Sequence, residues 1–225
     1  MEHHPLTVPH KPGAPSTRDT QPQRHPKRLT SAARRTQLLE IATAQFTQHG
    51  LCGTTTRALV TSAGITQPVL YSHFGSKRLL FQATVENNMA QRLRELEVRL
   101  ARIKGKTPEI LIRAMAEATV AVCLSGRANA TLMSWALLEL PECADELCRK
   151  EEDSIVLLWE RELSRRSADS RTRAHLSTDF VSYAVDACLA YGFWLAAHRR
   201  TPDTAAQLAR RFAAGVARQA SAILK

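Results

Sequence analysis

The segment ITQPVLYSHFGSKRLL, Ile65–Leu80, decides the fold class of this chain. Thr66 stands where a helix N-cap is expected, and Pro68 follows as the second helical residue. Proline costs little at that position, because the N–H groups of the first turn have no partner within a helix. Gly75 ends the helix, and Ser76 is placed to cap a longer helix that follows. The segment therefore predicts a short helix with both ends fixed by the sequence.

Two further helices are predicted upstream of this segment. The range Thr30–Gly50 has apolar residues at helical spacing, namely Leu38, Ile41, Ala42 and Phe46, and the glycine is expected to stop the helix. Thr54 is expected to cap a second helix, and Gly64 allows the left-handed turn that leads to the third. Leu70 and Phe74 lie one helical turn apart and are expected to face the first helix. Three helices with a glycine turn between the last two predict a helix-turn-helix.

The remaining side of the short helix is left for solvent or a DNA groove. It carries Gln67, Pro68, Val69, Ser72 and His73. Residues 1–80 hold ten Lys and Arg against three Asp and Glu, whereas residues 105–225 hold sixteen against fifteen. A basic N-terminal part points to a polyanion, most often nucleic acid, although a solvated basic surface has the same composition.

The composition indicates a helical protein without a membrane segment. Hydrophobic residues make up 44% of the chain and aromatic residues only 5%, which favours helices over sheet. The chain has no apolar run of about 18 residues and no apolar leader, so we expect a cytoplasmic protein with no membrane partner. Its five cysteines show no pairing pattern and are expected to be reduced thiols, with a redox switch at Cys143 and Cys148 left open.

The sequence does not indicate an enzyme, a cofactor or a metal site. The motifs GxGxxG, HExxH, GxSxG and the phosphate-binding loop do not occur. Glu139, Glu142 and Asp186 form no recognisable acid–base pair. Residues 1–28 are polar and are predicted to be a disordered basic arm, in which four histidines lack the spacing of metal ligands: His3, His4, His10 and His25. A helical adaptor that binds protein stays an alternative, which the basic N-terminal part disfavours.

The run Gly50–Glu86 resembles the TetR (tetracycline repressor) family of bacterial transcription regulators. The matching motifs are Thr56-Arg57, Ala63-Gly64-Ile65, Thr66-Gln67-Pro68, Leu70-Tyr71, His73-Phe74 and Ser76-Lys77. The resemblance covers about residues 33–86. It implies an all-α protein, with a three-helix helix-turn-helix DNA-binding domain over residues 29–80. A C-terminal helical domain for ligand binding and dimerisation is implied over residues 81–225.

The resemblance assigns DNA contacts to the matched positions. They are Thr56, Arg57, Gln67, Pro68, Val69, Tyr71, Ser72, His73 and Lys77. Arg57 is implied to contact a phosphate or a guanine, and Gln67 to read a base edge, where its amide suits adenine. The side chains of Pro68 and Val69 are implied to contact thymine methyl groups.

For several of these positions a plainer role stays open. Tyr71 and Lys77 are implied to contact phosphates, which fix register rather than sequence. Tyr71 could instead pack in the core, His73 could either pack or contact DNA, and Arg57 and Lys77 could be solvated charges. Ser72 stands where the tetracycline repressors have a large aromatic residue, so their operator sequence cannot be transferred to this protein.

The second half of the chain is predicted to be helical. One helix is expected from Pro108 to about Leu124, and after a break at Gly126 another runs to Pro141. In the family, the last two helices pair with those of a second subunit, although an internal helix hairpin would have a similar sequence. The expected contact face of the final helix is Ala205, Leu208, Phe212, Gly215 and Val216, with Ala209 and Ala213 nearby. The resemblance therefore implies a homodimer that binds a palindromic operator in double-stranded DNA, without a cofactor.

A small-molecule pocket is also implied for the C-terminal domain. The candidates to line it are Met133, Trp135, Trp159, Tyr183 and Trp194, for each of which an ordinary core position is the plain alternative. Because no buried charge cluster is evident, we expect an apolar or amphipathic effector. The implied function is a ligand-responsive DNA-binding regulator of the repressor type. The effector, the operator, the regulated genes and the choice between repression and activation stay open.

Overall fold

The computed structural model describes residues 29–104, 107–166, 177–198 and 201–223. Every regular element in these ranges is an α-helix, which confirms the predicted all-α fold. The helices are α1 (Ser31–Gly53), α2 (Thr56–Ala63), α3 (Gln67–Phe74), α4 (Lys77–Ala101), α5 (Pro108–Ser125), α6 (Arg127–Glu139), α7 (Pro141–Arg166), α9 (Thr178–Ala197) and α10 (Pro202–Ile223). The basic arm predicted for residues 1–28, with its four histidines, lies outside the described residues.

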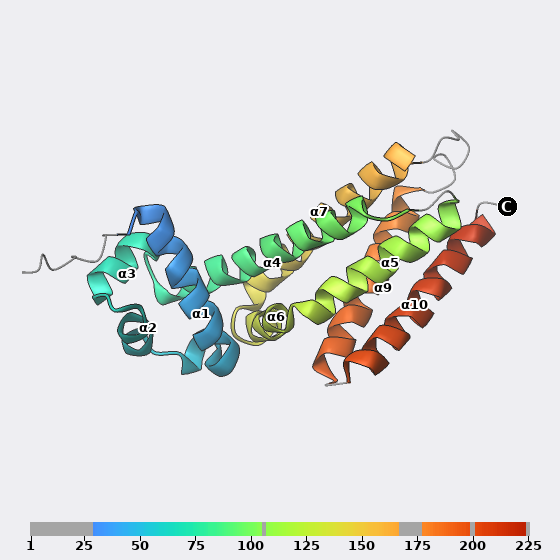
Figure 1. Ribbon diagram of the computed structural model, residues 1–225. Helices are drawn as coiled ribbons and strands as arrows, with labels where there is room; N and C mark the ends of the chain where they lie inside the picture. Colours follow the sequence, from blue (N-terminus) through green and yellow to red (C-terminus); the bar gives the residue numbers. More distant parts are fainter. Residues whose placement is uncertain (1–28, 105–106, 167–176, 199–200, 224–225) are drawn as a thin grey trace, which may run out of the picture.

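The described helices form a head and a body (Figure 1). The head contains α1, α2 and α3 at one end of the molecule, and the long helix α4 leads from it into the body. In the body, α5 packs against both α10 and α9, while α7 packs against α9 and α4. The short helix α6 packs against α1 of the head and against α4, α7 and α9, so it lies at the junction of the two parts.

The N-terminus of α2 differs by one residue from the prediction. Thr55, not Thr54, is the N-cap, and its Oγ1 accepts a hydrogen bond from Ala58 N at 3.1 Å. Thr54 is buried instead, and its hydroxyl donates to the carbonyl oxygen of Gly50 at 2.7 Å. The difference arises because Gly50 breaks α1 with a φ of 68° without ending it, and the helix resumes as far as Gly53.

Buried apolar side chains form two separate cores. The body core draws on the second half of α4 and on α5, α7, α9 and α10. The head core contains residues from α1, α2, α3 and the first half of α4, and it also takes in side chains from two later helices: Leu132, Met133, Ala136, Ala144 and Leu147. The head is therefore completed by α6 and the first turns of α7, which come far later in the chain.

Helix α10 buries a stripe of small residues within the subunit. The stripe runs through Ala205, Ala209, Ala213, Val216, Ala217 and Ala220. Of the contact face predicted for this helix, Leu208, Phe212 and Gly215 are only partly buried, so part of that face stays at the surface of the single chain. Small side chains on this stripe allow α10 to pack closely on α5, its main neighbour.

Helix α9 is long and apolar enough to cross a membrane by length and composition alone, and no other helix in the described ranges is. It packs against α5, α7 and α6 in the body. At Gly192 the approach to α5 is so close that an added Cβ would lie 2.6 Å from Cys123 Cβ. The apolar sequence of α9 is therefore accounted for, at least on this side, by helix packing within the protein.

Candidate nucleic-acid interface

One side of helix α3 packs against the head, and a cation from α1 contacts the C-terminal end of the helix. Leu70 and Phe74 are 1% and 7% exposed, as their spacing predicted. The guanidinium of Arg35 lies over the Phe74 ring, 4.3 Å from its centroid, and donates to the carbonyl oxygen of His73 at 3.0 Å. Because Arg35 thus caps the C-terminal end of α3, the helix has a fixed position relative to α1.

Two of the predicted phosphate contacts also hold the head together. The hydroxyl oxygens of Tyr71 and Thr56 are 3.1 Å apart and share a hydrogen bond, which links α3 to the start of α2. Lys77 Nζ donates to the carbonyl oxygen of Thr54 at 2.8 Å, at the end of α1. Both Tyr71 and Lys77 are partly exposed, so these internal bonds leave part of each side chain at the surface.

The opposite side of α3 is open, as predicted. Its exposed residues are Gln67, Pro68, Val69 and Ser72, with His73 half-buried beside them. The Ser72 hydroxyl donates to the carbonyl oxygen of Val69 at 2.8 Å. Gln67 and Arg57 are exposed, and neither side chain has a hydrogen-bond or ionic partner among the described residues. The amide and the guanidinium are therefore available for an external partner.

The basic side chains of the head differ in what they contact. Arg34 donates to Gln37 Oε1 at 2.7 Å. Arg78 forms an exposed ion pair with Glu142 at the start of α7, so part of its charge serves to join head and body. A hydrogen bond from its own backbone N–H and the contact with Arg78 lower the pKa of Glu142. Of the described cations in the head, Arg57 is thus the one most free to meet a phosphate.

Residues 38–84 match the family model of bacterial regulatory proteins of the tetR family. The match runs from the middle of α1, through α2 and α3, into the first turns of α4. This segment therefore has the sequence of a TetR-type DNA-binding head, which supports the predicted helix-turn-helix and its role in binding DNA.

Several solved structures share the fold of this chain. A TetR-family transcriptional regulator from Mesorhizobium loti is 18% identical, with a TM-score of 0.61 over 87% of this chain and 98% of its own. A transcriptional regulator from Pseudomonas aeruginosa is 17% identical, with a TM-score of 0.65 over 88% and 97%. GusR from Salmonella enterica is 17% identical, with a TM-score of 0.59 over 87% and 98%. No curated protein matches this sequence.

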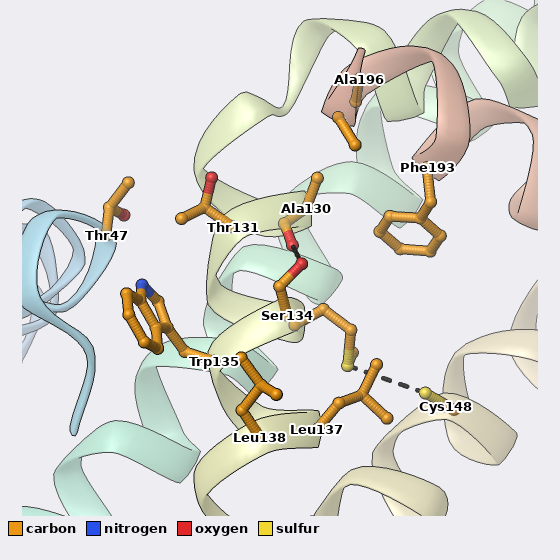
Figure 2. A pocket seen from close by; sticks show the side chains of 12 residues that line it. Thr47, Ala130, Thr131, Ser134, Trp135, Leu137, Leu138, Cys148, Phe193 and Ala196 are labelled. Atoms are coloured by element: carbon orange, nitrogen blue, oxygen red, sulfur yellow. Dashed lines mark hydrogen bonds between the residues drawn. The ribbon is translucent and has the colours of Figure 1, made fainter. Parts of the chain in front are cut away.

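The residues predicted to line a ligand pocket do not gather at one place. Met133 and Trp135 both line a cavity of about 680 Å³ at the junction of head and body (Figure 2). Trp159 is fully buried in the body core, where its Nε1 donates to Thr119 Oγ1 at 3.1 Å. Tyr183 and Trp194 lie at the surface of α9, 56% and 43% exposed. Only the two α6 residues are therefore placed at this cavity.

A buried charge cluster exists, contrary to the sequence-based expectation. Arg92 of α4 and Glu151 of α7 form an ion pair whose side chains are 3% and 7% exposed. The Arg92 guanidinium also lies over the Phe193 ring, 4.9 Å from its centroid, and within 2.8 Å of the Asn129 amide oxygen when that amide is oriented to accept. Burial raises the pKa of Glu151, while Arg92 opposes this shift.

The sequence contained a signal for this cluster. Arg92 occupies the position expected for an apolar residue in the buried stripe of α4, which runs through Val85, Met89, Leu96 and Leu100. A cation inside such a stripe indicates a buried partner. The role of Glu139 had no such signal, because the backbone groups that it binds lie 87 and 88 residues earlier in the chain.

The two cysteines considered for a redox switch have different surroundings. Cys143 Sγ is 3.9 Å from a guanidinium nitrogen of Arg78, whereas Cys148 Sγ is 3.7 Å from Met133 Sδ at the junction cavity. Burial raises the pKa of Cys148, which disfavours the reactive thiolate. None of the five cysteines, all of which lie in the described ranges, is paired in a disulfide.

Proposed function

We propose that the protein is a cytoplasmic, homodimeric repressor that binds a palindromic operator and is released by a small apolar or amphipathic effector. The observation that carries this proposal is the free face of α3 in a TetR-type head, with the unpaired side chains of Gln67 and Arg57 beside it. Glutamine presents a donor and an acceptor to adenine, and arginine presents donors to phosphate or guanine.

An unpartnered apolar stripe along α9 supports the dimer. Its exposed or half-buried members are Tyr183, Ala187, Ala190, Tyr191, Trp194 and Ala197. The Tyr191 ring stacks on Phe212 of α10 at a centroid distance of 4.4 Å, so the stripe extends over both C-terminal helices. A monomer rarely exposes such a continuous apolar surface. Two subunits joined there would present two α3 helices, which read half-sites about 34 Å apart.

The effector part of the proposal rests on the junction cavity. Its walls are mainly apolar, and it contacts α1 of the head as well as α6, α7 and α9 (Figure 2). A ligand that fills it can favour one arrangement of head and body over another, and the difference in affinity for the two arrangements would weaken operator binding.

Substitution of Gln67 tests the assignment of base reading. We expect Gln67→Ala to lose about 1–3 kcal/mol of binding free energy per half-site on the natural operator, because the contacted base pair loses its hydrogen bonds. On operators that are already mutated at this base pair, the variant and the wild type should bind equally well. Gel-shift titrations on the chain's own upstream intergenic DNA, with single-base variants, measure this. The matched variant Lys77→Ala should bind all operators more weakly by the same factor. Its melting temperature is also measured, because Lys77 donates a hydrogen bond to Thr54 within the head. Equal losses from both variants on every operator contradict the assignment.

Substitution within the apolar stripe tests the dimer. We expect Tyr183→Glu to weaken dimerisation at least about tenfold, because a charge would be buried against the partner without compensation. Sedimentation over a range of protein concentrations measures the dissociation constant. Leu157 of α7 is a matched control, since its side chain is also apolar and is 66% exposed but lies off the stripe. Equal effects of Tyr183→Glu and Leu157→Glu, or a monomeric wild type, would rule out this interface.

A further inference from the structure

The junction cavity has a single buried polar group that lacks a partner. Trp135 lines the cavity from α6, and its indole Nε1–H is buried without an acceptor among the described residues. Figure 2 shows the nitrogen edge of the ring turned toward the side of the cavity where Thr47 and Thr131 lie. A buried donor without an acceptor costs about 1–3 kcal/mol, so an acceptor supplied here contributes binding free energy.

The same indole ring packs against the break in α1. A Cβ added to Gly50 would lie 2.9 Å from two carbons of the Trp135 ring, so only glycine leaves room for the ring at this distance. The break and the cavity wall are therefore in direct contact. A shift of the ring away from Gly50 would remove the packing on which the shape of the break depends.

One turn further along α6, Glu139 caps the backbone after the break. Its Oε2 accepts hydrogen bonds from Leu51 N at 2.5 Å and Cys52 N at 3.2 Å. These N–H groups begin the last helical turn of α1, where a carboxylate is a favourable cap. The caps at this break thus come from two parts of the molecule, because Thr54 of the head also donates to the Gly50 carbonyl oxygen.

The break connects directly to the DNA-binding elements. Thr54 follows α1 and accepts a hydrogen bond from Lys77 at the start of α4. The next residue, Thr55, is the N-cap of α2, and Thr56 shares a hydrogen bond with Tyr71 of α3. A continuous series of contacts therefore runs from the wall of the cavity to α3.

From these contacts we infer that the junction cavity binds an apolar molecule with one hydrogen-bond acceptor, and that Trp135 Nε1–H donates to this acceptor. The indole ring leaves its place on Gly50 when it makes this bond, the Glu139 cap weakens, and α2 and α3 lose their fixed position on α1. This inference deepens the proposed function, since it specifies the ligand chemistry and the route by which the ligand releases DNA.

Acetophenone and ethylbenzene test the ligand chemistry, because they have nearly the same shape but only the ketone has an acceptor. Ligand-observed NMR titrations would measure their dissociation constants on the full chain. Trp135→Phe keeps an aromatic ring and removes the N–H. It should therefore lower the affinity for acetophenone at least about fivefold and the affinity for ethylbenzene less than about twofold. The Trp135 indole N–H resonance of the wild type should shift with acetophenone alone.

Trp159→Phe is the matched control, because it also removes an indole N–H, while Trp159 lies in the body core and does not line this cavity. It should leave both affinities unchanged. Equal effects of Trp135→Phe on the two probes, or failure of acetophenone to bind the wild type, overturn the inference. Melting temperatures of the variants show whether any loss reflects unfolding.

Operator binding in the presence of acetophenone tests the route. Saturating acetophenone should weaken operator binding by the wild type at least about fivefold in fluorescence anisotropy titrations. Glu139→Ala should bind the operator more weakly than the wild type without the probe and show no further change with it. If acetophenone binds through Trp135 but leaves operator affinity unchanged, the route is wrong. If the wild type binds no operator at all while the NMR result stands, the proposed function fails and the ligand chemistry does not.

Discussion

Binding to the upstream DNA is expected to weaken by about 10³–10⁵-fold when the salt concentration rises from about 50 mM to about 200 mM. A loss of this size corresponds to about six to ten phosphate contacts, each of which releases a counterion when it forms. A dimer has two heads, and each head has Arg34, Arg35, Arg57 and Lys77 as exposed or half-buried cations that can contact phosphates. Fluorescence anisotropy titrations at several salt concentrations measure the slope of log K against log salt.

Arg57→Gln provides the matched control for this slope. Arg57 is exposed and unpaired among the described residues, so its substitution should not disturb the packing of the head. Loss of one phosphate contact in each subunit should reduce the slope by about two in the dimer. A slope near zero in the wild type, together with no protected region on the DNA, contradicts the DNA-binding proposal. It would favour the adaptor alternative instead.

The second large effect is expected at the buried ion pair. Arg92→Met should lower the free energy of unfolding by about 3–5 kcal/mol, because Glu151 would be left buried without its cation. Urea denaturation at pH 7 measures this loss. The double variant Arg92→Met/Glu151→Leu should recover most of it, since apolar residues can replace a buried pair. Arg161→Met, which breaks the exposed pair with Glu97, should cost less than about 1 kcal/mol.

The loss in Arg92→Met should also depend on pH. Burial raises the pKa of Glu151 above its value in the unfolded chain, and the variant removes the cation that opposes this shift. A raised carboxyl pKa means that the folded state binds the proton more tightly. The protonated group therefore contributes fully below the unfolded-state pKa, and its contribution is lost as pH rises through the folded-state pKa. The difference between variant and wild type should be smaller at pH 5 than at pH 7, and a difference independent of pH would contradict this account.

The head could be predicted closely because its signals are local. Pro68 and Gly75 lie at the two ends of α3, and each acts on the backbone beside it. Thr66 stands at the N-cap position as predicted, but its side chain makes no capping hydrogen bond. The prediction that Thr54 is the N-cap of α2 was wrong, because the sequence does not show that the chain resumes a helix after Gly50. That outcome depends on Glu139, which reaches the break from a distant helix.

The body and its cavity could be predicted only in part. The helices were recognised, but the surroundings of their aromatic residues depend on which helices pack together, and a single sequence does not reveal this. Trp135 and Trp159 each follow apolar residues in a predicted helix, yet one lines the junction cavity and the other lies in the body core. Arg92 has a signal in the sequence, namely its place in the apolar stripe of α4, but the prediction that no buried charge cluster exists overlooked it and was wrong.

Because α6 and α7 contribute to the head core, the head cannot easily be exchanged with that of another protein. Leu132, Met133 and Ala136 cover side chains that belong to the first three helices. A chimaera that carried only those three helices onto another regulator would leave this hydrophobic surface in contact with a foreign α6. Exchange of DNA specificity between relatives is therefore easier by replacing single residues on the open side of α3 than by transplanting the whole head.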